Sequence, residues 1–218
     1  MGCRQKLAIG LTGGIGSGKS RVAELLRELG AVVECSDQIV RELQAPGGIA
    51  LAEIATRFGE EYLQPSGELD RTRLGELVFR DPEARRKLGD IMHPLVYREL
   101  AKRLEDHRQR GARVVVLDIP LLLEGRASGR GSGALLPLDL VVVVYADEET
   151  QLARIMARDQ LSREDALSRV RAQLSIEKKR GLADVVIDNS GDWESAAKQV
   201  RECYAEWISD ETPNAAPR

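Results

Sequence analysis

The sequence predicts an α/β fold in which helices flank a parallel sheet of five strands. Five short apolar runs have the length and composition of buried strands, and they occupy residues 7–11, 31–33, 114–117, 140–145 and 184–187. Segments with the helical spacing of apolar residues separate these runs. A glycine-rich loop joins the first run to the first helix, at the edge where parallel sheets bind their ligands.

This loop predicts that the chain binds a nucleotide. Residues 10–20 read Gly-Leu-Thr-Gly-Gly-Ile-Gly-Ser-Gly-Lys-Ser and contain the pattern G-x-x-x-x-G-K-[ST]. In this pattern backbone N–H groups surround the phosphates, Lys19 reaches the terminal phosphates and the Ser20 hydroxyl binds Mg²⁺. Apolar residues with helical spacing follow until Gly30, so strand, loop and helix succeed one another as in a P-loop NTPase. The residues expected to hold the nucleotide in this loop are Gly13, Gly14, Ile15, Gly16, Ser17, Gly18, Lys19 and Ser20.

Two aspartates follow predicted strands. Asp37 comes after the second apolar run and Asp118 after the third, so both should lie at the sheet edge that carries the loop. Phosphoryl transfer needs a group that orients or deprotonates the acceptor, and we prefer Asp37 as this general base. Asp37 could instead cap the helix that follows it. Asp118 competes for the role of base, and it also suits an aspartate that holds Mg²⁺ through water.

The segment between Asp37 and Gly111 contains no convincing strand but several helical patterns. Asp81 and Pro82 provide a cap and a first-turn proline for one helix, and we expect a helix break at His93-Pro94. A parallel sheet needs only one crossover helix here, so we predict a helical substrate lobe over residues 37–111. Ordinary packing of these helices against the sheet is the alternative. We assign His93 no catalytic role.

The charged stretch between the last two predicted strands indicates a helical lid over residues 151–181. Arg154 and Arg158 are four residues apart, so both side chains lie on one helix face and could clamp the transferring phosphoryl group. Ser162 and Asp165 form a capping pattern for a second helix. The alternative is a solvated arginine face paired with neighbouring acids. We also expect the Gly- and Ser-rich residues 125–137 to be mobile.

Size and composition limit the remaining possibilities. The chain has 218 residues, 43% of them hydrophobic, which suits one α/β domain with core residues 5–36, 112–150 and 182–209. Its net charge of −3 argues against nucleic acid as a partner. Three scattered cysteines and the absence of a long apolar run favour a cytoplasmic protein without a membrane partner. We expect residues 210–218 to form a disordered tail. The sequence does not determine the oligomeric state.

Taken together, these residues resemble the dephospho-coenzyme A (dephospho-CoA) kinase family, and the resemblance runs from about residue 6 to residue 200. A phosphate loop alone would fit many functions, whereas the ordered set of further matches is far more specific. Besides the loop, the matching positions in order are Asp37, Arg41, Leu69-Asp70-Arg71, Leu74, Phe79, His93-Pro94, Asp118-Ile119-Pro120-Leu121-Leu122, Glu124, Gln151, Arg154, Arg158-Asp159, Gln173, Ala183-Asp184, Asp188-Asn189 and Gly191.

The resemblance implies that ATP, with Mg²⁺, phosphorylates the ribose 3′-hydroxyl of dephospho-CoA. It also implies a five-stranded P-loop core, a helical lobe for the coenzyme moiety and a lid that closes over ATP. The resemblance places the family's proposed base at Asp37. With the roles argued above, we expect Lys19, Asp37 and Arg154 to be catalytic, Arg158 to join the loop at the nucleotide, and Ser20 and Asp118 to hold the metal. The resemblance also places the Pro-Leu-Leu segment after Asp118 beside the acceptor. The residues that we expect to bind the acceptor are Asp37, Arg41, His93, Asp118, Pro120 and Leu121.

The chain departs from the family pattern in two places. Cys35-Ser36-Asp37 stands where the family usually reads Asp-Ala-Asp, so the first acid is replaced while the second is kept. The role of that first carboxylate is therefore open in this chain. The loop after Glu124 is also longer than usual, which blurs the start of the next strand.

Three other functions compete with this interpretation. A GTPase switch needs an N-K-x-D guanine-binding motif, and neither asparagine of the chain, Asn189 or Asn214, is followed by lysine. Another small-molecule kinase, such as a nucleoside-monophosphate kinase, is the nearer alternative. A nucleotide-dependent binding or regulatory protein that has lost catalysis is the third, and the replacement by Cys35 keeps it open.

Overall fold

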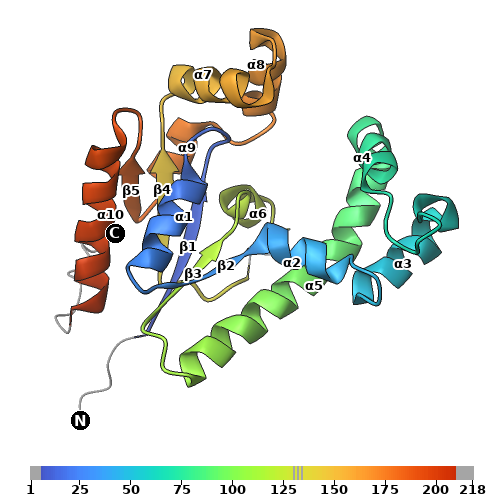
Figure 1. Ribbon diagram of the computed structural model, residues 1–218, viewed down its shortest axis with the longest axis horizontal. Coiled ribbons are helices and arrows are strands. Elements are labelled where there is room, and N and C mark those ends of the chain that lie inside the picture. Colours follow the sequence, from blue (N-terminus) through green and yellow to red (C-terminus); the bar gives the residue numbers. More distant parts are fainter. Residues whose placement is uncertain (1–5, 130, 132, 134, 210–218) are drawn as a thin grey trace.

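The computed structural model describes residues 6–129, 131, 133 and 135–209. Its strands form one sheet in the order β2-β3-β1-β4-β5, and all neighbours are parallel (Figure 1). This confirms the predicted fold, and each predicted apolar run overlaps a strand. The elements are β1 (Leu7–Gly13), α1 (Lys19–Glu28), β2 (Val32–Cys35), α2 (Ser36–Leu43), α3 (Ile49–Phe58), the 3₁₀ turn η1 (Glu60–Tyr62), α4 (Arg71–Arg80), α5 (Pro82–Gln109), β3 (Val114–Asp118), α6 (Leu122–Ser128), β4 (Leu140–Tyr145), α7 (Glu148–Asp159), α8 (Arg163–Arg171), α9 (Ile176–Gly181), β5 (Val185–Asp188) and α10 (Trp193–Ile208).

Strand β1 forms the centre of the sheet, and all seven of its residues are buried. One face of the sheet packs against α1 and α10, in a core that includes Val22, Leu26 and Val200. The other face packs against a larger core that includes Leu100 of α5 and Leu122 of α6. Burial on both faces explains why the strands are continuous apolar runs without alternation. Because the strands are parallel, their carboxyl ends lie at one edge of the sheet.

The helices between β2 and β3 extend to one side of the sheet, where α2, α3 and α4 pack against the long helix α5 (Figure 1). The expected helix break at His93-Pro94 is wrong, since α5 continues from Pro82 to Gln109 with Pro94 inside it. Met92 before the proline and Leu95 after it are buried in the same apolar core. This packing outweighs the single backbone hydrogen bond that Pro94 cannot donate.

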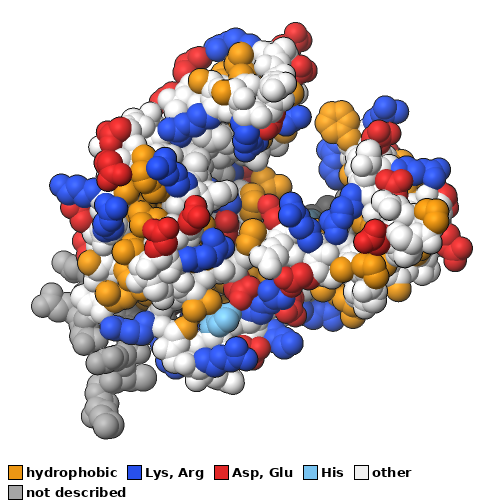
Figure 2. All heavy atoms as spheres, viewed as in Figure 1, with side chains coloured by type: hydrophobic (Ala, Val, Ile, Leu, Met, Phe, Trp, Pro, Cys, Tyr) orange, Lys and Arg blue, Asp and Glu red, His pale blue; other side chains and the backbone are white. Residues whose placement is uncertain are grey.

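Helices α7 and α8 lie beyond the carboxyl ends of the strands (Figure 1) and pack on each other around Ile155 and Val170. The Ser162 hydroxyl accepts a hydrogen bond from the Asp165 N–H at 3.1 Å, so the predicted cap of α8 is present. Helix α9 then returns to the sheet beside β4. Figure 2 shows an open cleft between the α7–α8 pair and the helices around α4.

We expected residues 125–137 to form a mobile loop, but residues 125–128 belong to α6, which ends at Ser128. Residues 130, 132 and 134 of that loop, and the predicted tail at 210–218, lie outside the described residues. Within the described part of the chain, no helix combines the length and the apolar composition that crossing a membrane requires.

Candidate active site

The glycine-rich loop connects β1 to α1 and has a backbone that only glycine tolerates at two positions. Gly16 and Gly18 have positive φ angles of 78° and 86°. A Cβ atom would lie 2.7 Å from the Gln151 carbonyl oxygen at Gly16, and 2.3 Å from Asn189 Nδ2 at Gly18. Gly18 caps the start of α1 without a side chain, which leaves the first N–H groups of the helix accessible to an anion.

Polar side chains from the last third of the chain form hydrogen bonds to the backbone of this loop. Gln173 Oε1 accepts a hydrogen bond from the Ile15 N–H at 3.0 Å, and Asn189 Nδ2 donates to the Ser17 carbonyl at 2.7 Å. Arg154 donates to the Gly16 carbonyl at 3.4 Å and to the Asn189 carbonyl at 2.8 Å. The loop therefore has a fixed conformation that does not depend on a bound phosphate to define it.

Lys19 and Asp118 form an ion pair at the same sheet edge. Lys19 opens α1, and its Nζ binds a carboxylate oxygen of Asp118 at the end of β3. Both side chains are largely buried, with 14% and 6% of their surfaces exposed. The Asp118 backbone lies beside Leu11 of β1 and Cys35 of β2, so the register of the sheet places the carboxylate directly behind the loop.

A second lysine at this edge was not identified from the sequence. Lys179 of α9 has no exposed surface, and its ammonium donates to the Gly13 carbonyl at 3.0 Å, the Pro120 carbonyl at 3.3 Å and Glu124 at 2.9 Å. Burial lowers the pKa of Lys179 below its ordinary value, while the hydrogen bond to Glu124 opposes that shift. One sequence signal could have indicated that Lys179 is buried. It lies three residues after the apolar Ile176, and residues three apart share a helix face.

Asp37 lies where two cavities meet. A loop cavity of about 560 Å³ is lined by the glycine-rich loop together with Lys19, Ser20 and Arg154. An inner lobe cavity of about 500 Å³ is lined by apolar side chains of α2 and α5, among them Val40 and Met92. Three residues line both cavities, namely Asp37, Pro120 and Gln173. Asp37 is exposed in the first turn of α2, so it faces both spaces as an accessible carboxylate.

The other predicted acceptor residues differ in where they lie. Pro120, Leu121 and His93 line the inner lobe cavity, and Leu121 exposes 51% of its surface there. Arg41 is exposed one helical turn beyond Asp37 on α2, and it is not among the described residues that line either cavity. Its described contact is through its carbonyl oxygen, which accepts a hydrogen bond from Arg71 at 3.3 Å.

The structure distinguishes the two arginines that the sequence places on one face of the predicted lid. Both line the loop cavity, but only Arg154 bonds to the phosphate loop. The Arg158 guanidinium donates to Asp159 at 2.7 and 2.9 Å, and 62% of its side chain is exposed. The hydrogen bond to Asp159 raises the pKa of Arg158 above its usual range. Arg158 thus fits the alternative of a solvated arginine paired with a neighbouring acid, whereas Arg154 does not.

The oxygen donors near the loop suit a magnesium ion that is held mainly by substrate phosphates. The Ser20 hydroxyl is exposed in the loop cavity, next to the lysine that binds Asp118. Among the described residues, no three His, Cys, Asp or Glu side chains form a cluster that could enclose a metal alone. Mg²⁺ usually keeps several waters and takes one or two protein ligands plus phosphate oxygens, so this donor set fits it.

Comparison with known proteins finds a consistent set of relatives. Residues 7–195 match the family model described as dephospho-CoA kinase. A dephospho-CoA kinase of Geobacter sulfurreducens is 46% identical over 198 residues, which cover 90% of this chain and 96% of the relative. The structure of a Thermus thermophilus protein superposes with a TM-score of 0.74 at 37% identity, covering 93% of this chain and 98% of that one. A dephospho-CoA kinase from Campylobacter jejuni superposes with a TM-score of 0.69 at 30% identity, covering 93% and 97%.

Proposed function

The chain belongs to the dephospho-CoA kinase family, and on that premise we propose that it transfers the γ-phosphoryl group of ATP to the ribose 3′-hydroxyl of dephospho-CoA, giving CoA and ADP. The observation that carries this proposal is the position of Asp37. It lines both the cavity of the phosphate loop and the apolar inner lobe cavity, so it can approach a donor and an acceptor at once.

On the donor side, the loop amides and the start of α1 bind the phosphates of ATP. Lys19 neutralises the terminal phosphates, and its contact with Asp118 keeps the ammonium at the sheet edge. Arg154 adds a cation from α7 that is already bonded to the loop at Gly16. Since little covalent chemistry is required of the protein, this fixed array of donors lowers the barrier mainly by alignment and charge stabilisation.

On the acceptor side, Asp37 acts as general base. The ribose 3′-oxygen forms a bond to the γ-phosphorus as the bond from that phosphorus to the β,γ-bridging oxygen breaks. The electron pair of the broken bond stays on ADP, and the hydroxyl proton moves to the Asp37 carboxylate. Asp37 suits this role because it is exposed and accessible to a hydroxyl, whereas Asp118 is buried against Lys19. Pro120 and Leu121 form the adjoining wall, consistent with a place beside the acceptor.

We assign the magnesium ion of the reaction to Ser20, with Asp118 behind it as the carboxylate that acts through water. When bound, Mg²⁺ neutralises developing charge on the phosphate oxygens. Ser20 follows Lys19 at the start of α1, so one turn of helix presents both the hydroxyl and the ammonium to the loop cavity. The cytoplasm remains the location that we expect for this activity.

The test is an acceptor comparison with the purified full-length protein, ATP and Mg²⁺. We expect dephospho-CoA to gain one phosphate, detected by mass spectrometry of the product, with one ADP formed for each CoA. Nucleoside monophosphates should yield no nucleoside diphosphate under the same conditions. Phosphorylation of the monophosphates with dephospho-CoA left unchanged would reject the assignment of substrate and favour a nucleoside-monophosphate kinase.

A further inference from the structure

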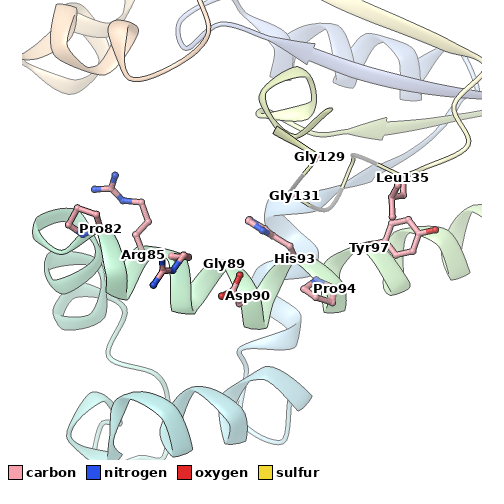
Figure 3. Close-up of a pocket in the computed structure, with 11 residues that line it drawn as sticks. Pro82, Arg85, Gly89, Asp90, His93, Pro94, Tyr97, Gly129, Gly131 and Leu135 are labelled. Carbon is pink, nitrogen blue, oxygen red and sulfur yellow. The ribbon is translucent and has the colours of Figure 1, made fainter. Parts of the chain in front are cut away.

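A third cavity lies along the same stretch of α5, between Pro82 and Tyr97, and adjoins the inner lobe cavity. This outer lobe cavity has a volume of about 650 Å³, and its walls include Pro94, Tyr97 and Leu135 (Figure 3). Of the α5 residues, Arg85, Gly89 and His93 line both lobe cavities. Figure 3 shows these three residues following one another along α5, with His93 reaching toward the segment that carries Gly131, and Tyr97 beside Leu135. The two cavities therefore share one passage along this stretch of α5.

The order of groups in the acceptor determines which group lies in this passage. In dephospho-CoA, adenine and ribose are joined by a 5′-diphosphate to the pantetheine arm. If the ribose hydroxyl meets Asp37, as the proposed function requires, the adenosine occupies the inner lobe cavity that Asp37 lines. Its apolar walls, which include Val40, Met92 and Ile119, suit a flat base. The diphosphate then lies in the passage, and the arm continues into the outer lobe cavity.

Among the described residues that line both lobe cavities, Arg85 is the one cation, whereas Arg86 lines only the outer cavity. Arg85 donates from Nε to the Val78 carbonyl and from Nη2 to the Phe79 carbonyl, both at 2.9 Å. These bonds fix the plane of the guanidinium at the end of α4. Of the carboxylates that the structure describes, none forms an ion pair with Arg85, so its positive charge and its remaining N–H groups are available to an anionic ligand.

The second titratable group in the passage does not supply this charge. Protein atoms around His93 partly exclude water and lower the pKa of its imidazole below the ordinary value, while Asp90 opposes that shift. At neutral pH the ring is uncharged and can offer one hydrogen-bond donor.

We propose that Arg85 binds the 5′-diphosphate of dephospho-CoA at the passage between the two lobe cavities, so that adenosine lies in the inner cavity and the pantetheine arm in the outer one. The proposal rests on the proposed function and adds a residue that sequence reasoning did not single out. A planar, fixed guanidinium is suited to a diphosphate because two of its N–H groups can meet two phosphate oxygens.

The experiment compares two ligands that lack the reactive hydroxyl and differ in the diphosphate arm. The 3′-deoxy analogue of dephospho-CoA carries the diphosphate and the arm, and 3′-deoxyadenosine carries neither. Both are titrated calorimetrically into wild type, Arg85→Gln, Arg85→Lys and Arg98→Gln, with Mg²⁺ and a non-hydrolysable ATP analogue at saturation. Arg98 is the matched control, because it is an exposed arginine of α5 outside both sets of cavity-lining residues.

We expect Arg85→Gln to raise the Kd of the dephospho-CoA analogue by about tenfold to a hundredfold, the range for a hydrogen bond to a charged group. Arg85→Lys should recover part of this loss, and the Kd of 3′-deoxyadenosine should stay within about twofold in every variant. Arg98→Gln should change neither ligand.

Equal weakening of both ligands in Arg85→Gln would overturn the proposal, because it would mean that Arg85 acts only by holding the end of α4. An unchanged Kd for the dephospho-CoA analogue would place the diphosphate elsewhere and overturn it as well. Failure of the proposed function gives a different result, since wild type would then neither bind the analogue nor phosphorylate dephospho-CoA.

Discussion

The loop cavity and the two lobe cavities have walls of different construction. Around the loop, polar groups are already bonded to the backbone, as Arg154 is to Gly16 and Gln173 is to Ile15. Around the lobe cavities, apolar side chains of the helices form most of the surface, and the charged groups, such as Arg85, are exposed. The difference indicates that the transferring phosphate meets a fixed array of donors, whereas the acceptor is selected by the shape of the lobe and by a few charges.

The strongest test of this comparison concerns Asp37, the residue where the two kinds of wall meet. We expect Asp37→Asn to lower kcat by about 10² to 10⁴, because asparagine keeps the shape but cannot take the hydroxyl proton. The affinity for ATP should remain, since the proposed mechanism assigns the phosphate contacts to the glycine-rich loop and not to Asp37. Steady-state kinetics and ATP titration measure the two quantities separately.

A near-normal kcat in Asp37→Asn would show that Asp37, at the junction of the cavities, is not the general base. The role would then pass to Asp118, or no base would be needed. Thermal unfolding of the same variant is the control, because Asp37 is exposed in the first turn of α2 and its replacement should change stability little.

The next largest effect should come from replacing Lys179. This variant tests whether the phosphate loop depends on the hydrogen bonds that the buried ammonium makes. Lys179→Met removes the ammonium from two backbone carbonyls and from Glu124, and it leaves those acceptors without their partner. We expect the free energy of unfolding to fall by about 2 to 4 kcal/mol, the order found for an uncompensated buried polar group. The KM for ATP should rise as well, because Gly13 begins the loop. Denaturant unfolding and kinetics check both.

Lys178 provides the matched control for this variant, because it is exposed beside Lys179 on α9. Lys178→Met should change the unfolding free energy by no more than about 0.5 kcal/mol. If both variants behave alike, the buried ammonium does not stabilise the loop. Lys179→Arg should restore the charge but strain a site with no exposed surface.

The donor side could be predicted from the sequence far better than the acceptor side. The loop and the strand before it are local patterns with fixed geometry, and the parallel pairing of β2 with β3 places Cys35, two residues before Asp37, beside Asp118. Lys179 could not be assigned, because its partners lie 55 to 166 residues away, at Glu124 and Gly13, and form only in the fold. Likewise, the continuation of α5 through Pro94 depends on tertiary packing that outweighs the local preference of proline.

Replacing the two arginines of α7 separately sharpens the comparison within the predicted lid. Arg154→Ala should lower kcat/KM for ATP by about tenfold to a hundredfold, because the guanidinium is bonded to the loop that we propose as the phosphate site. Arg158→Ala should lower it by less than about threefold, since an exposed ion pair contributes little. Equal losses in the two variants would show that both arginines reach the phosphate. An unchanged rate for Arg154→Ala at saturating ATP would place Arg154 with the solvated arginines.

The smallest expected effect concerns Cys35, where the chain departs from the usual sequence of its family. Cys35 is the N-cap residue of α2 and makes no side-chain capping hydrogen bond, so an N–H of the first turn of the helix lacks that partner. Its backbone also lies beside Asp118 in the sheet. A carboxylate at this position would therefore cap α2 and face a second carboxylate at the same time.

Two substitutions separate these contributions. Cys35→Asn supplies a neutral cap and should raise the free energy of unfolding by about 1 kcal/mol. Cys35→Asp supplies the same cap with a negative charge. At low ionic strength, repulsion from Asp118 should make its increase in the free energy of unfolding smaller than that of Cys35→Asn. Thermal unfolding at low and high salt measures both, and salt should narrow the difference between the variants. If asparagine gives no stabilisation, the N-cap argument for this position is wrong. If Cys35→Asp is more stable than Cys35→Asn at every salt concentration, a carboxylate at this position has a favourable partner. Lys19, which binds the neighbouring Asp118, is then the described cation to test as that partner.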